Sequence, residues 1–144
     1  MARIEFHFNA PALVHYACRL LRKVHGHGKR AQVVGHATTL VQLDQALWTF
    51  SALDFVPHCG PDAPQTMRSA SCALLTEQVR DDWDRQILVN LGESVPQGFE
   101  GFERVIEVVS VDDLHRAQGR ERWREYSRLG HDMIRHDLSQ ASKP

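Results

Sequence analysis

The first half of the chain alternates between two hydrophobic periods, and this alternation constrains the fold more than any other feature of the sequence. Residues 2–8, ARIEFHF, place an apolar side chain at every second position, as a strand with one buried face does. From Pro11 the apolar positions recur every three or four residues, which predicts an amphipathic helix that ends in the GHGKR segment at 26–30. Because a strand, a crossover helix and a second strand form a parallel pair, we expect a mainly parallel sheet.

The remaining segments extend the same architecture. Further strands are predicted at 31–36, 71–77, 85–92 and 104–110, and further helices at about 38–50 and 112–133. The chain has 144 residues, which is the size of one domain with its own core. We therefore predict a single α/β domain over residues 1–138, with a five-stranded, mainly parallel sheet flanked by helices. Residues 139–144 are predicted to form a flexible C-terminal tail.

Composition excludes several classes of function. The formal net charge is −1, whereas a general binder of polyanions is normally basic overall, so any anion site must be local. No apolar run approaches the roughly 18 residues that a membrane helix needs. Three cysteines without a CxxC pair argue against a disulfide framework and favour a reducing cytoplasm.

The predicted α/β pattern raises the possibility of a nucleotide site, which the loop sequences do not support. The first link from strand to helix is Asn9-Ala10-Pro11, which has no glycine to let the backbone approach a pyrophosphate. The GHGKR segment lies at a link from helix to strand and lacks the phosphate-loop spacing. The expected fold therefore resembles nucleotide-binding folds without a phosphate loop, and no cofactor is expected. A small nucleotide- or phosphate-binding α/β enzyme is the alternative.

Nine histidines invite a metal hypothesis, but their spacing does not single out a ligand set. His25 and His27 form an HxH pair with no acidic or sulfur partner near them in the sequence. His58 and Cys59 are adjacent, and adjacent side chains on an extended chain point apart. Scattered surface histidines are the favoured interpretation, so no metal ligand and no catalytic residue is predicted.

The segment GRERWREYSRLG, residues 119–130, has two faces when placed on a helix. The outward face is predicted to contain Arg116, Arg120, Arg124 and Ser127, with Trp123 at its edge. The inward face is predicted to contain Gly119, Arg122, Tyr126, Leu129 and Met133. Because Arg122 falls on the inward face, we expect it to pair with a carboxylate inside the fold.

The outward face leaves four interpretations open. It can be a solvated surface with ion pairs from Glu121 to Arg124 and from Glu125 to Arg128. Arginines beside an aromatic ring can also stack on single-stranded bases, bind the carboxylates of an acidic peptide, or bind phosphate. Direct binding of single-stranded nucleic acid is thus a further alternative function, although the near-neutral net charge argues against it.

Trp48 suggests a second surface. It lies one residue off the apolar stripe of its predicted helix, Leu40, Leu43, Leu47 and Phe50, and Phe55 follows seven residues later. The two rings can be a packing pair at the edge of the core or an aromatic hot spot for a partner protein.

Taken together, four segments resemble the chi subunit family of bacterial DNA polymerase III holoenzyme. They are IEFHF near the N-terminus, GKRAQVVG before the second predicted strand, LDQALWTFSALDFVPH, and RERWREYSRLG near the C-terminus. The resemblance covers nearly the whole chain in the family's order. Trp123 stands where some relatives have tyrosine, and Arg124 stands where some have lysine.

This resemblance implies an adaptor rather than an enzyme. It implies that Trp48 and Phe55 bind the psi subunit of the clamp loader, on a surface that also serves a helicase in some bacteria. It implies that Arg120, Trp123 and Arg124, with Val109 as apolar lining, bind the acidic and hydrophobic C-terminal tail of single-stranded DNA-binding protein. DNA would then be contacted only indirectly, and no membrane is involved.

Overall fold

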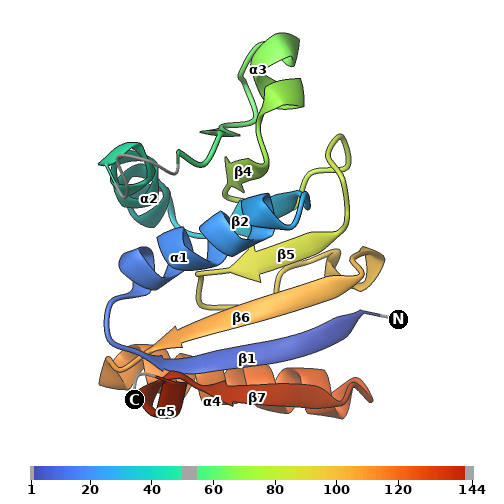
Figure 1. Cartoon of the computed structure of the whole chain (residues 1–144). Helices are drawn as coiled ribbons and strands as arrows, with labels where there is room; N and C mark the ends of the chain where they lie inside the picture. Colours follow the sequence, from blue (N-terminus) through green and yellow to red (C-terminus); the bar gives the residue numbers. More distant parts are fainter. Residues whose placement is uncertain (1, 50–54, 142–144) are drawn as a thin grey trace.

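The computed structural model describes residues 2–49 and 55–141, and the described strands form one parallel sheet (Figure 1). The strands are β1 (Arg3–Ala10), β2 (Ala31–Val34), β3 (His58–Cys59), β4 (Ala73–Thr76), β5 (Ile87–Asn90), β6 (Arg104–Ser110) and β7 (Met133–Asp137). Their order across the sheet is β3-β4-β2-β5-β6-β1-β7. Every strand pairing in the described residues is parallel, as the alternation of strand and helix predicts.

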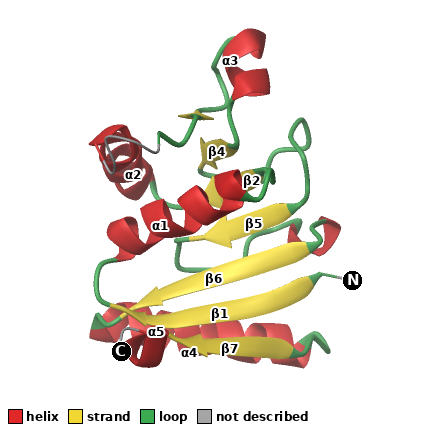
Figure 2. Cartoon of the chain, in the orientation of Figure 1, coloured by secondary structure: helices red, strands yellow, loops and turns green. Residues whose placement is uncertain are grey.

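Helices cover both faces of this sheet. They are α1 (Leu13–Gly26), α2 (Ala37–Thr49), α3 (Gln65–Ala70), α4 (Asp113–Arg128), α5 (Leu138–Ala141) and the 3₁₀ turn η1 (Phe99–Gly101). In Figure 2, α1 crosses in front of the sheet and α4 passes behind the edge formed by β1 and β7. Two separate apolar clusters follow from this arrangement, one beneath α1 and α2 and one between the sheet, α4 and η1.

The direction of the chain across the sheet explains why the helices take opposite faces. From β1 the chain crosses through α1 to β2, toward the β3 edge. From β6 it crosses through α4 to β7, toward the other edge. Right-handed crossovers in opposite directions place their helices on opposite faces. From the carboxyl ends of the neighbouring strands β1 and β6 the chain therefore leaves toward opposite faces, and this is the place where α/β sheets usually bind ligands.

The sheet has seven strands instead of the five predicted. The extra strand β3 has only two residues and lies in the segment predicted to be a turn-rich loop, as does the start of α3. The extra strand β7 begins at Met133, the predicted end of the last helix, and continues through residues for which no element is predicted. That helix ends at Arg128, and Gly130 follows with a φ of 89°, a left-handed conformation that stops helices.

Of the other predicted boundaries, one agrees with the structure, one differs from it, and some residues lie outside the described part. Gly28, in the GHGKR segment, has a φ of 69° and closes α1 as expected. Phe50, predicted as part of the apolar stripe of α2, lies outside the described residues. The predicted start of the tail, residue 139, falls inside α5, and residues 142–144 also lie outside the described part.

The three cysteines are buried free thiols. Burial raises the pKa of the Cys18 thiol and of the Cys72 thiol to about 11. Within residues 2–49 and 55–141, no helix is long and apolar enough to cross a membrane.

Candidate functional site

A buried charged cluster holds α4 against the sheet. Glu107 on β6 is fully buried, and its carboxylate accepts hydrogen bonds from Arg122 Nε at 2.7 Å and from the Tyr126 hydroxyl at 2.7 Å. The Asn90 amide on β5 donates to both carboxylate oxygens, at 2.9 and 3.0 Å. Burial, followed by the charge of Glu107, raises the pKa of Tyr126 and keeps its hydroxyl protonated. The prediction that Arg122 pairs with an internal carboxylate is confirmed.

This cluster sets the rotation of α4 and so decides which side chains face outward. Arg116, Arg120 and Arg124 are exposed along one side of the helix, as predicted. Trp123 is half-buried, and its ring meets the edge of Phe6 with 5.0 Å between the ring centroids. The inward placement of Leu129 is wrong, because it follows the last helical residue and is 52% exposed.

A groove runs between α4 and the strands β1, β6 and β7, with a volume of about 410 Å³. We call it the α4 groove, and its lining residues are Phe6, Phe8, Asn9, Val109, Arg116, Gly119, Arg120, Trp123 and Arg135. The rings and the valine form an apolar floor, and three guanidinium groups surround it. An apolar floor with a cationic rim is suited to a ligand that combines a hydrophobic group with negative charges.

Gly119 allows α4 to approach the floor of this groove. A Cβ atom at this position would lie 2.9 Å from Val109 Cγ2, which is closer than van der Waals contact allows. The glycine therefore places the helix backbone directly against β6. Gly119 lines the groove together with Val109 and Trp123.

The sequence-predicted residues divide between the groove and its surroundings. Val109, Arg120 and Trp123 line the groove together. Arg124 does not line it, and its guanidinium pairs with Glu121 on the exposed side of α4. Arg128 pairs with Glu125 at 3.0 Å. Both intrahelical ion pairs that the solvated-face interpretation predicts are thus present.

Arg135 is a groove residue that the sequence pattern did not indicate. It lies on β7, which pairs with β1 so that Arg135 is the register partner of Phe6. Its guanidinium carbon lies 5.0 Å from the centre of the Phe8 ring and 6.0 Å from that of Trp123. The MIRHD segment is short and mostly polar, so it carried no signal for a strand that would bring Arg135 beside α4.

The second predicted surface consists of exposed rings on α2 and the following segment. Trp48 is 62% exposed and Phe55 is 44% exposed, and their ring centroids lie 4.9 Å apart. Both rings contact His58, which bonds to Asp44 Oδ1 at 2.9 Å and to the Val56 carbonyl oxygen at 2.8 Å. Val41, one heptad before Trp48 on α2, is also exposed. We call this group of three apolar side chains the Trp48 surface.

Comparison with solved structures places the fold in a class of parallel α/β domains. The C-terminal domain of the DEAD-box protein Dbp5 superposes with a TM-score of 0.60 at 14% identity, covering 96% of this chain and 91% of that one. At this identity, the likeness concerns the fold alone.

Comparison with protein families is more specific. The family model described as DNA polymerase III chi subunit, HolC, matches residues 1–134. The chain belongs to this family of replication accessory proteins. The chi subunit of Pseudomonas aeruginosa is 29% identical over 96% of this chain and 98% of its own length. The chi subunit of Haemophilus influenzae is 27% identical over 76% of both chains.

Proposed function

We propose that this chain is a non-catalytic adaptor that connects the polymerase III clamp loader, through psi, to the C-terminal tail of single-stranded DNA-binding protein. The observation that carries the proposal is the α4 groove, where an apolar floor and three arginines lie within one cavity. Membership of the chi family and the resemblance of the terminal helix support the same assignment. Both partners are replication proteins, so the expected place of action is the cytoplasm.

The chemistry of the groove suits a tail that ends in acidic residues and a C-terminal phenylalanine. The phenylalanine ring would pack on Val109 and beside Trp123, where the floor is apolar. Arg120 and Arg135 would meet the terminal carboxylate and the acidic side chains, because guanidinium groups bind carboxylates in a bidentate manner. Arg124 would contribute through its charge at the end of the groove rather than through contact with the ring.

The Trp48 surface supports the other half of the proposal. Trp48 and Phe55 present two large rings to solvent, and exposed aromatic pairs are typical anchors of protein interfaces. Val41 and Trp48 lie on α2, which packs on the sheet face opposite α4. A partner bound at the Trp48 surface would therefore leave the α4 groove free. We assign this surface to psi, or to a helicase in its place.

A peptide titration tests the assignment of the groove. We expect Arg120→Ala to weaken binding of a labelled acidic tail peptide about tenfold, because a charge-assisted hydrogen bond contributes about 1.5–3 kcal/mol. Arg128→Ala is the matched control, since Arg128 lies on the same helix, is exposed and does not line the groove. Fluorescence anisotropy measures both affinities.

Equal affinities for wild type and Arg120→Ala would remove the groove from the proposal. Binding of a naked single-stranded oligonucleotide in the same assay, at the affinity of the peptide, would favour direct nucleic-acid binding instead.

Capture of purified psi by wild type, but not by Trp48→Ala, is expected for the Trp48 surface. Unchanged capture would argue against its assignment.

A further inference from the structure

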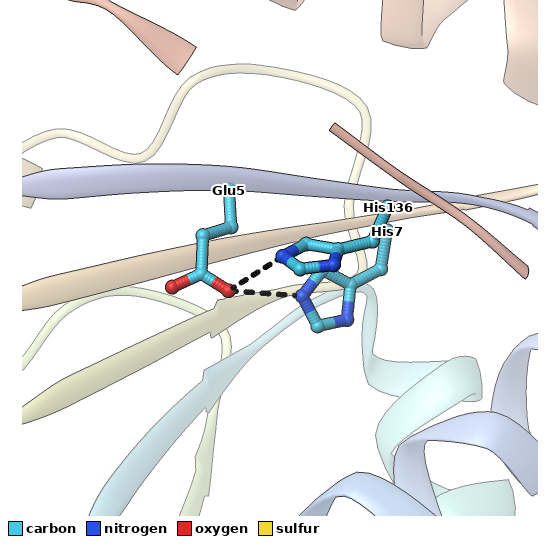
Figure 3. Close-up of side chains that lie close together, drawn as sticks. All are labelled: Glu5, His7 and His136. Carbon is cyan, nitrogen blue, oxygen red and sulfur yellow. Dashed lines mark hydrogen bonds and ion pairs between the residues drawn. The ribbon is translucent and has the colours of Figure 1, made fainter. Parts of the chain in front are cut away.

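A compact group of potential metal ligands lies on the sheet face opposite the α4 groove. Figure 3 shows the imidazoles of His7 and His136 pointing to one oxygen of the Glu5 carboxylate. His7 Nε2 lies 3.1 Å and His136 Nε2 lies 3.5 Å from Glu5 Oε1. The three ligand atoms lie within 4.8 Å of one another. We call this group the β1–β7 cluster.

These separations match those around a single small metal ion. A zinc ion with ligands at about 2.0–2.2 Å in tetrahedral geometry holds its ligand atoms about 3.3 Å apart. The parallel pairing of β1 with β7 makes His7 and His136 register partners, so both rings project from the same face of the sheet. Glu5 precedes His7 by two residues on β1 and shares that face. The ligands therefore come from neighbouring strands of a rigid sheet.

The surroundings of His7 resemble the outer shell of a metal ligand. His7 Nδ1 lies 2.5 Å from the hydroxyl of Tyr16 on α1. The direction of this hydrogen bond depends on the tautomer of His7. In the tautomer that carries its proton on Nδ1, His7 donates to the Tyr16 hydroxyl and presents the lone pair of Nε2 to a metal ion.

Two arginines hold the Glu5 carboxylate in place. Arg104 on β6 donates from Nε to Glu5 Oε2 at 2.6 Å and from Nη2 to Oε1 at 2.9 Å, and Arg3 Nε lies 3.0 Å from Oε2. Arg3 bonds only to the oxygen that faces away from the histidines. Both guanidinium groups repel a cation and so weaken the site, and Arg104 also donates to Oε1, the oxygen that would face the ion.

The cluster is open to solvent on one side. It borders a cavity of about 740 Å³ between α1 and the strands, whose lining includes His7, Tyr16, Arg104 and His136. Glu5 and His7 are buried, whereas the His136 side chain is 49% exposed and leaves an entry path. Three protein ligands with one open side leave a fourth coordination position for water or for a ligand in the cavity.

We propose that Glu5, His7 and His136 bind one divalent transition-metal ion of the zinc type, through Glu5 Oε1 and the Nε2 atoms of both histidines. Two imidazoles and one carboxylate favour zinc, cobalt or nickel over magnesium or calcium. The ion would join the first strand to the last one, and it would stabilise the native state because the unfolded chain does not hold the ligands together. This site is independent of the proposed adaptor function.

Titration of the full chain with Co²⁺ and Zn²⁺ tests the proposal. We expect one ion per chain, with the visible absorption of tetrahedral cobalt, a rise in melting temperature with zinc, and no such rise with magnesium. His136→Ala should weaken zinc binding at least tenfold, since it removes a ligand from a half-exposed position. Arg3→Met should tighten binding severalfold, because it removes a repelling charge from Glu5.

The variant His25→Ala is the control for adventitious binding by the HxH pair, because His25 does not line the cavity beside the cluster, and it should retain the zinc affinity of the wild type. Loss of zinc binding in this variant, with His136→Ala unchanged, would overturn the proposal. Absence of stoichiometric zinc binding by the wild type would also overturn it. Circular dichroism of His136→Ala verifies that the variant is folded before its affinity is compared.

Discussion

At the scale of single residues, the protein separates arginines that hold the fold from arginines that face solvent. Arg122 and Arg120 are two positions apart on α4, yet one is 2% exposed and the other lies on the rim of a groove. The difference follows from the 100° step of the helix and from the buried acceptor that Glu107 supplies. What an arginine contributes, to the stability of the fold or to binding, therefore depends on the partner of its guanidinium group and not on the residue type.

Removal of the buried arginine should strongly destabilise the fold. Arg122→Met leaves the Glu107 carboxylate buried without its counter-charge, so we expect a loss of about 3–5 kcal/mol in the free energy of unfolding. The double variant Arg122→Met with Glu107→Gln should lose less, because it buries no unpaired charge. Urea denaturation followed by circular dichroism measures both. A loss below about 1 kcal/mol in the single variant would show that the pair does not hold α4.

At the scale of elements, the contact of α4 with β6 depends on one missing side chain. Gly119 lies in the middle of the helix, where alanine would normally be favoured by about 1 kcal/mol. The stiff, β-branched Val109 beneath it leaves no room for a Cβ atom. Glycine at this position therefore lowers the helix propensity of α4, but it allows the helix to pack closely against β6. That close packing shapes the groove.

Gly119→Ala should thus be destabilising, against its helix propensity, by about 1–3 kcal/mol through overpacking. It should also lower tail-peptide affinity, because a displaced α4 moves Trp123 and Arg120 relative to Val109. Gly26→Ala is the control, since a Cβ at Gly26 meets no atom within 4 Å. Thermal melts and the peptide titration provide the two readouts. A Gly119→Ala protein as stable as Gly26→Ala would contradict this account of the contact.

At the scale of the whole molecule, charge is distributed locally instead of uniformly. The formal net charge of the chain is −1, yet three arginines lie together at the rim of the α4 groove. A short acidic peptide would be attracted by this local positive charge, whereas a long polyanion would also be repelled by the acidic remainder of the surface. Because the rim arginines are exposed, salt screens them with a Debye length of about 8–10 Å at 0.10–0.15 M ionic strength.

Tail-peptide affinity should therefore fall steadily as sodium chloride rises from low to high concentration. The same titration with Arg120→Ala should show a shallower dependence, since one of the screened charges is gone. Isothermal calorimetry across a salt series measures both slopes. An affinity that does not change with salt would mean that burial of the phenylalanine ring, and not the arginine rim, dominates binding.

Most of the architecture could be predicted from local sequence patterns, because they report burial directly. The apolar strands β2, β4, β5 and β6 each appeared as a short hydrophobic run, and α1 appeared through its spacing of three and four. The elements that were missed are short or polar. β3 has two residues, and β7 is an edge strand whose middle residues are exposed, so neither carries a hydrophobic period.

The sequence by itself determined the class of the fold and the two faces of α4, since helical periodicity is a local property. The helical period alone predicts that Arg122 faces the core and that Arg120 faces solvent. Only the tertiary structure decided which side chains meet across elements. It brought Arg135 to the groove, left Arg124 beside Glu121, and joined Glu5 and His7 to His136. These contacts depend on the pairing of β7 with β1, which links opposite ends of the chain. The alternation of residues 2–8 predicts β1 itself but does not indicate which strand pairs with it.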